Sequence, residues 1–146
     1  YYFARREDLL LGVADYTLHQ LVRDRVAFQD GATTVAEKVE SEMSLAEAYC
    51  RPSSRFVKVL AGLYVASVDI PALKTKLASI WAEWRGYISE QMEQAKSEGA
   101  IKDGSDFADA DMLLASFFGL GLVAHMHDGS FDASGHLDTI FNSLMK

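Results

Sequence analysis

The sequence predicts an all-α protein of about six helices, and three observations support this fold class. Apolar residues recur every three to four positions along most of the chain, as on one face of a helix. No stretch alternates apolar and polar residues for long enough to be a convincing strand. Two prolines occur, Pro52 and Pro71, and both stand where the helical period lapses, so they separate helices.

The composition favours one domain. The chain has 146 residues, of which 49% are hydrophobic and 24% charged, as is ordinary for a globular protein. A chain of this length buries about two thirds of its unfolded surface. No apolar run approaches the roughly 18 residues that span a bilayer, and no signal peptide is recognisable. We therefore expect a cytoplasmic protein with no membrane partner.

Charge and cysteine content exclude further classes. The net charge of −7 argues against a nucleic-acid surface within these residues, because contact with phosphates requires clustered Lys and Arg. The single cysteine, Cys50, excludes an internal disulfide and a cysteine-based zinc site. We expect it to be a small buried hydrophobe.

The first helix is expected at residues 6–27. Glu7 and Asp8 lie in its first turn, where the helix dipole favours negative charge. Asp30-Gly31 follows as a turn and ends the segment. We expect most of its apolar side to consist of Leu9, Leu10, Val13, Tyr16, Leu21 and Val22.

The second helix is expected at residues 34–49, capped by Thr33 or Thr34, and the spacing from Thr34 to Glu37 fits a capping box. It ends before Pro52, because proline cannot continue a helix and restricts the residue before it. We expect Val35, Val39, Met43, Ala46 and Cys50 to face inward, and Glu37, Lys38, Glu40 and Glu42 to face outward.

The third and fourth helices are expected at residues 54–67 and 71–98. Pro71 suits the first position of a helix, where its missing N–H costs nothing. Gly99 suits the C′ position that ends the long fourth helix. The apolar stripe of this long helix is Leu73, Leu77, Ile80, Trp81, Trp84, Ile88 and Met92.

The last two helices are expected at residues 107–126 and 134–145. Asp106 is the expected N-cap of the first of them. That helix is apolar nearly all round, so it must be buried on more than one side. Gly119 and Gly121 would permit close approach of a neighbour. The final helix is expected to bury Leu137, Ile140, Phe141 and Leu144.

The opening of the chain consists of aromatic residues at positions 1–3, a break, and then Arg6-Glu7-Asp8-Leu9-Leu10. It resembles the signature that closes the helix-turn-helix domain of TetR-family transcription regulators. In that family the recognition helix ends in a run such as Leu-Tyr-x-His/Tyr-Phe, and Lys-Glu-x-Leu-Leu opens the fourth helix. Arg5 departs from the family pattern, because a small polar N-cap worth about 1 kcal/mol usually stands there. The matching residues are Tyr1, Tyr2, Phe3, Arg6, Glu7, Leu9 and Leu10.

Later segments extend the resemblance along the chain. They are residues 60–67, the Asp-x-Pro-x-Leu start at residues 69–73, the Gly-Ala-Ile segment at 99–101 and the Gly-Leu-Gly-Leu segment at 119–122. Each is weak singly, but their order and spacing match the family. The resemblance implies that residues 1–5 end a DNA-binding domain and that residues 6–146 form a ligand-binding and dimerisation domain.

The resemblance further implies a TetR-like transcription regulator, acting as a repressor, with a small-molecule effector. Operator DNA would be bound through an N-terminal domain largely missing from this chain. By residue-by-residue carry-over, Tyr1, Tyr2 and Arg6 occupy positions that in the family lie near DNA phosphates. The alternative is a helical small-molecule carrier without DNA-binding activity, in which the opening resemblance is accidental.

Aromatic, Met and Cys side chains on the helical stripes suit the wall of a small-molecule pocket, and the resemblance implies one within this bundle. Ordinary core packing is the alternative for each of these residues. A cationic ligand could be held by cation–π attraction to tryptophan and tyrosine. The predicted lining for a small apolar or aromatic ligand is Met43, Cys50, Phe56, Leu60, Tyr64, Trp81, Trp84 and Phe117.

The last two helices carry more apolar surface than one subunit readily covers. The resemblance implies a homodimer whose interface is a four-helix arrangement of these two helices from each subunit. The alternative is that they complete the core of the monomer. The predicted interface residues are Phe118, Gly119, Leu122, Met126, Leu137, Ile140, Phe141 and Leu144.

Motifs for metal binding or catalysis are not recognisable. His125 and His127 are two positions apart, so on a helix they diverge by about 200° and do not readily share one ion. The acidic run from Asp103 to Asp111 lacks the correctly placed Gly and Glu of a calcium loop. No nucleophile elbow or phosphate-binding glycine loop occurs. We expect no metal, no cofactor and no enzymatic activity.

Overall fold

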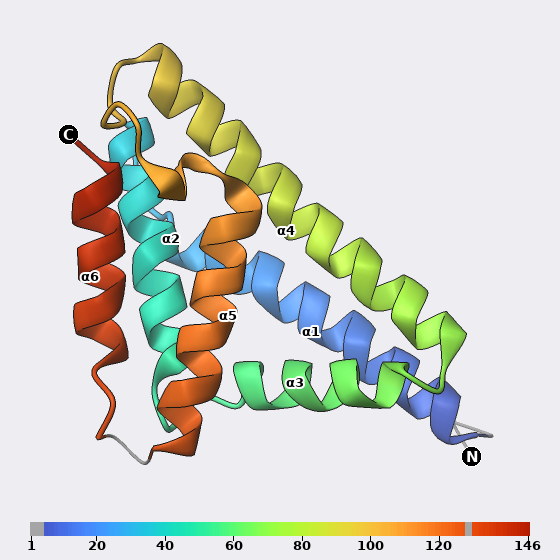
Figure 1. Cartoon of the computed structure of the whole chain (residues 1–146). Coiled ribbons are helices and arrows are strands. Elements are labelled where there is room, and N and C mark those ends of the chain that lie inside the picture. The colour runs from blue at the N-terminus through green and yellow to red at the C-terminus, as the bar shows by residue number, and fades with distance from the viewer. Residues whose placement is uncertain (1–4, 128–129) are drawn as a thin grey trace.

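The computed structural model describes residues 5–127 and 130–146, which form six α-helices and one 3-10 turn (Figure 1). The described residues contain no strand, so the all-α prediction is confirmed. No helix in these two ranges combines the length and the apolar character needed to cross a membrane. The elements are α1 (Arg6–Phe28), α2 (Val35–Cys50), α3 (Phe56–Ser67), α4 (Pro71–Ser97), η1 (Asp106–Ala108), α5 (Ala110–Met126) and α6 (Ala133–Leu144).

The two longest helices, α1 and α4, pack against each other along one flank of the molecule (Figure 1). At one end, α3 runs across and contacts α1, α4 and α5. At the other end α2, α5 and α6 stand together, and α2 packs against both of the others. The start of α1 therefore lies far from α6, whereas its second half adjoins α2.

Most helix ends lie where the turn and capping residues predict them. The predicted capping box is present: the Thr34 hydroxyl accepts the Glu37 N–H at 3.2 Å, and the Glu37 carboxylate accepts the Thr34 N–H at 3.0 Å. Pro71 is the first residue of α4. Gly99 follows the end of this helix with φ of 69°, a conformation that suits glycine.

The start of the fifth helix differs from the prediction. Asp106 does not cap it but begins the separate turn η1. The cap of α5 is Asp109, whose carboxylate accepts the Met112 N–H at 2.9 Å. Asp109 has the extended backbone angles φ −94° and ψ 125°, which interrupt a helix and divide the predicted segment in two.

The buried side of α1 also differs from the prediction. The residues that it buries are Ala14, Thr17 and Leu21. Apolar residues occur all round this helix, so the sequence period alone does not specify which side faces the core. The small side chains of Ala14 and Thr17 allow the neighbouring helices to pack closely on this side. Three residues predicted to be buried are instead exposed: Leu9, Tyr16 and Val22.

The C-terminal end is hydrogen-bonded to the loop that follows α4. The Lys102 N–H donates to the Leu144 carbonyl at 2.8 Å, and the Lys146 N–H donates to the Ala100 carbonyl at 2.9 Å. Leu144 is fully buried. The loop thus fixes the C-terminal end of α6, and α2 and α5 contact this helix as well.

Candidate ligand-binding site

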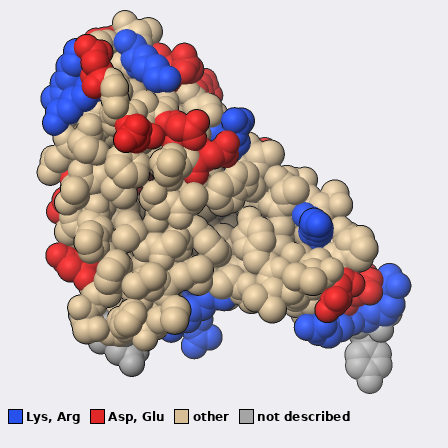
Figure 2. Space-filling model, in the orientation of Figure 1, with Lys and Arg blue, Asp and Glu red and all other residues tan. Residues whose placement is uncertain are grey.

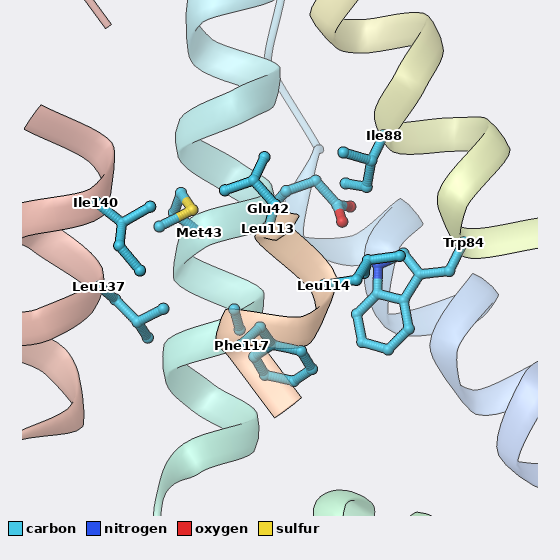
Figure 3. A pocket seen from close by; sticks show the side chains of 10 residues that line it. Glu42, Met43, Trp84, Ile88, Leu113, Leu114, Phe117, Leu137 and Ile140 are labelled. Atoms are coloured by element: carbon cyan, nitrogen blue, oxygen red, sulfur yellow. The ribbon is translucent and has the colours of Figure 1, made fainter. Parts of the chain in front are cut away.

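A small cavity lies between α2, α4, α5 and α6 (Figure 3). Its volume is about 40 Å³, which is room for roughly one or two water molecules. Pockets for drug-sized ligands have volumes of about 300–1,000 Å³, so such a ligand would have to displace side chains of the wall. The cavity is lined by Glu42, Met43, Ala46, Trp84, Ile88, Leu113, Leu114, Phe117, Leu137 and Ile140.

The helical spacing brings these side chains to one place. Trp84 and Ile88 are four residues apart on α4, and Leu114 and Phe117 are three apart on α5. Side chains at these spacings share one face of a helix. Both α4 and α5 thus present one apolar face to the cavity.

A cluster of aromatic rings forms one wall. Trp84 meets Phe117 edge to face, with ring centroids 5.1 Å apart. Phe56 meets Trp84 in the same manner at 6.0 Å and stacks on Tyr49 at 3.9 Å. Such contacts add about 0.5–1.5 kcal/mol per pair to the burial of the rings. This wall is therefore rigid, whereas Met43 on the opposite side is flexible.

Glu42 is the charged residue among the described lining residues (Figure 3). Its side chain is 9% exposed, and Arg25 of α1 donates to it through Nε at 2.7 Å and Nη2 at 3.5 Å. Burial raises the pKa of the Glu42 carboxyl, while Arg25 opposes this by favouring the charged form. The carboxylate is thus poorly solvated and depends on a cationic partner.

Three further contacts surround this ion pair. The Arg25 guanidinium lies 3.8 Å from the centre of the Tyr87 ring, which is a cation–π contact between α1 and α4. Gln29 donates to the Tyr87 hydroxyl, and the Tyr49 hydroxyl donates to Asp24 at 2.8 Å. Burial raises the pKa of Tyr87 to about 12. We call Asp24, Arg25, Gln29, Glu42, Tyr49 and Tyr87 the α1 polar cluster.

The predicted pocket residues are divided between two sites and the core. Met43, Trp84 and Phe117 line the cavity. Tyr64 and Trp81 line a separate groove between α3, α4 and α5 with a volume of about 570 Å³. Trp81 and Trp84 are three residues apart and neighbours on α4, yet Trp81 borders the groove and Trp84 borders the cavity. The predicted lining residues that are buried in the core, outside the cavity wall, are Cys50, Phe56 and Leu60.

Glu42 was missed because acidic residues usually face solvent, and its predicted outward position is wrong. The spacing carries a signal that identifies it. Position 42 is three residues after Val39 and four before Ala46, both of which are buried, so it lies on the inward face of α2. Arg25 similarly follows the fully buried Leu21 by one helical turn.

The predicted interface residues occupy different environments. Leu137, Ile140 and Leu144 are buried within the subunit, because α6 turns its apolar face inward against α2 and α5. These three side chains are thus not available to a partner. Met126 is 76% exposed, and Figure 2 shows a broad face over α5 with few charged residues. The other predicted residues are the exposed Gly119 and the half-buried Phe118, Leu122 and Phe141.

Of the predicted DNA contacts, Tyr1 and Tyr2 lie outside the described residues. Arg6 is exposed at the first position of α1. Within residues 5–127 and 130–146, no group of three His, Cys, Asp or Glu side chains could hold a metal ion.

Comparison with known proteins identifies a similar solved structure. That structure is described as a TetR transcriptional regulator from Chloroflexus aurantiacus J-10-fl, and it aligns with a TM-score of 0.79. The alignment covers 99% of this chain and 77% of that one, at 18% sequence identity. No family model matches the chain, and no curated protein sequence matches it significantly. The chain thus has a TetR-like helical fold.

Proposed function

We propose that this chain is the ligand-binding and dimerisation domain of a TetR-like transcription regulator that acts as a repressor. The fold carries the proposal, because the similarity to a TetR regulator extends over 99% of the chain. The apolar cavity between α2, α4, α5 and α6 supports a binding role rather than a catalytic one. A small organic effector would occupy this cavity after displacing flexible wall residues such as Met43.

In this proposal α1 transmits the effect of the ligand. Its second half carries Arg25, which contacts the cavity residue Glu42, and its start carries the exposed Arg6. A helix-turn-helix domain joined to α1 would contact DNA. If the protein has two conformations that differ in the position of α1, a ligand that binds one of them more tightly increases the population of that one. Two recognition helices must match half-sites about 34 Å apart, so a small change in α1 alters DNA affinity.

The proposed dimer interface is the outward face of α5. Met112, Gly119 and Met126 are seven residues apart in sequence and all exposed, so they form one stripe along the helix. Leu122 lies at lower exposure beside this stripe and would extend the contact on α5. Figure 2 supports this choice, since the face over α5 has few charges that a partner would have to desolvate.

The test uses the complete product of the gene. Native mass spectrometry should detect a dimer, and selection from genomic fragments should yield a pseudo-palindromic DNA site. An effector should release this DNA and change the Trp84 fluorescence. The control is Ala46→Met, which fills the cavity and should abolish the response to effector while DNA binding persists. A monomer that binds a small molecule but no DNA would instead establish the carrier function.

A further inference from the structure

The groups that line the cavity favour one chemical class of ligand. The inference that follows rests on the proposed function. The wall of the cavity is apolar except for the Glu42 side chain of α2 and the indole N–H of Trp84 of α4 (Figure 3). A ligand in the cavity would meet the Glu42 acceptor directly. Arg25 is not among the lining residues, because it approaches Glu42 from α1. The charged group on the ligand side is therefore the Glu42 carboxylate, and its cationic partner Arg25 lies behind it on α1.

A recess on the surface adjoins the cavity and is also lined by carboxylates. It lies between α2 and α6 and has a volume of about 250 Å³. Glu40, Glu47 and Asp138 line it, and no Lys or Arg is among its described lining residues. Met43 and Leu137 line both the recess and the cavity, so these two side chains form the partition between them.

The charges of the recess are available to attract a ligand. Glu47 has one ion-pair contact, to Arg51 Nη2 at 3.9 Å, and both side chains are substantially exposed. Such a pair is weak and screened by water. A concave surface lined by one sign of charge raises the local concentration of oppositely charged molecules. The recess thus favours cations and disfavours anions before either reaches the partition.

The inner wall suits the same class of ligand. The Trp84 and Phe117 rings flank the cavity beside Glu42. The face of an aromatic ring attracts an organic cation within about 6 Å, most strongly when water is excluded. Glu42 has one cationic partner within the described residues, Arg25, so a second cation that replaces it keeps the carboxylate paired. The cost of leaving Arg25 without an anion is partly offset by its contact with the Tyr87 ring.

We infer that the effector is a hydrophobic organic cation, an ammonium group on an aromatic or branched apolar body, which pairs with Glu42 in place of Arg25. It passes from the acidic recess into the cavity by displacing Met43. Arg25 then keeps its contact with Tyr87 but loses its bond to α2. The α1 polar cluster is thereby opened on the side of α2, which frees the second half of α1 to move.

The test compares three probes of similar size on the purified protein: benzyltrimethylammonium, its neutral carbon analogue neopentylbenzene, and the anion phenylacetate. Binding is measured by tryptophan fluorescence and calorimetry. The cation should bind about tenfold or more tightly than the neutral analogue, and phenylacetate weakest of all. Equal or tighter binding of the neutral analogue, or no binding of the cation to the folded protein, would overturn the inference.

Two variants are expected to change binding of the cation in opposite directions, so loss of folding cannot explain both results. Circular dichroism checks that each variant is folded. Glu42→Gln should remove the preference for the cation. Arg25→Gln leaves Glu42 without its internal partner and should tighten binding of the cation about tenfold while leaving the neutral analogue unchanged. Glu83→Gln, on the exposed face of α4, is the matched control and should behave as the wild type. A preference that persists in Glu42→Gln would contradict the assignment.

The recess is tested separately by the triple variant Glu40→Gln, Glu47→Gln, Asp138→Asn. It should slow association of the cation several-fold at low salt and leave its dissociation unchanged. An unchanged association rate would remove the recess from the pathway. Failure of the proposed function has a different signature: the complete gene product would bind no DNA, whichever probe the cavity prefers.

Discussion

At the scale of single residues, Gly121 is the glycine of α5 at which an added Cβ would meet neighbouring helices. A Cβ atom there would lie 2.9 and 3.2 Å from the two methyl groups of Val57, and 3.6 Å from the sulfur of Cys50. We expect Gly121→Ala to lower the free energy of unfolding by about 1–2 kcal/mol, because overpacking outweighs the gain in helix propensity. Urea unfolding followed by circular dichroism measures this change.

The control for this prediction is Gly86→Ala on α4, where an added Cβ meets nothing within 4 Å. It should raise the free energy of unfolding by up to about 1 kcal/mol through helix propensity alone. The double variant Val57→Ala, Gly121→Ala should lose less stability than the two single changes together, because the same methyl groups cause the clash. Stabilisation by Gly121→Ala alone would contradict the close packing.

Residue identity predicts burial poorly where a charged side chain is paired. Positions 25 and 42 follow the apolar residues of their own helices at helical spacing, yet Arg and Glu are ordinarily exposed. Their burial depends on each other, since either charge alone would be costly inside the protein. A sequence that places them 17 positions apart does not reveal that they meet. The most informative residue of the cavity was therefore absent from the predicted lining.

At the scale of helices, the cap of α2 has a measurable dependence on pH. Hydrogen bonds from the N–H groups of Thr33 and Thr34 lower the pKa of Glu37 from 4.5 to about 2. Because the folded pKa is the lower one, the stability contributed by this carboxylate is fully present above pH 4.5 and is lost as the pH falls towards 2. Glu37→Gln should therefore be less stable than the wild type above pH 4.5, and the difference should shrink below it.

Urea unfolding at several pH values measures this difference, and a carboxyl NMR titration of Glu37 measures the pKa itself. Glu83→Gln on the exposed face of α4 is the control, because it changes the same charge outside any cap. The stability difference between Glu83→Gln and the wild type should not shrink in this way as the pH falls. A stability difference for Glu37→Gln that stays constant as the pH falls below 4.5 would show that the cap does not depend on the charge.

Helix ends were predicted better than helix faces, because ends depend on interactions between residues close in sequence, whereas faces depend on packing between distant segments. A cap or a proline acts within one turn of the chain, so Thr34, Pro71 and Gly99 mark their positions without tertiary structure. The buried face of α1 depends on which neighbours arrive and on how closely they pack. Apolar residues on several sides leave this choice to the other helices, which here cover Ala14, Thr17 and Leu21.

At the scale of the whole molecule, the fold class and the order of the helices follow from the sequence, but the pocket does not. Trp81 and Trp84 lie on one predicted stripe, yet α5 separates them into a groove and a cavity. Such a division depends on the angles between α3, α4 and α5, which no local pattern specifies. The same applies to α6, whose apolar stripe could complete a core or bind a partner and here lies inside the subunit.

The proposed dimer is the feature of the whole molecule that can be tested most directly. Met126 is 76% exposed on the outward stripe of α5, so Met126→Asp removes little packing within one subunit. In the proposed interface the new carboxylate would be desolvated and would face its own copy across the two-fold axis. We expect the dissociation constant of the dimer to rise by tenfold or more, which is at least about 1.4 kcal/mol. Analytical ultracentrifugation over a range of concentrations measures it.

The matched control is Val65→Asp, which introduces the same charge at a position 75% exposed on α3, away from the proposed interface. It should leave the dissociation constant unchanged, because an isolated surface charge costs little in water. Loss of the dimer in both variants would point to a general effect of charge. A dimer that survives Met126→Asp but not Val65→Asp would place the interface on α3. The proposed dimer contact through α5 would then be wrong.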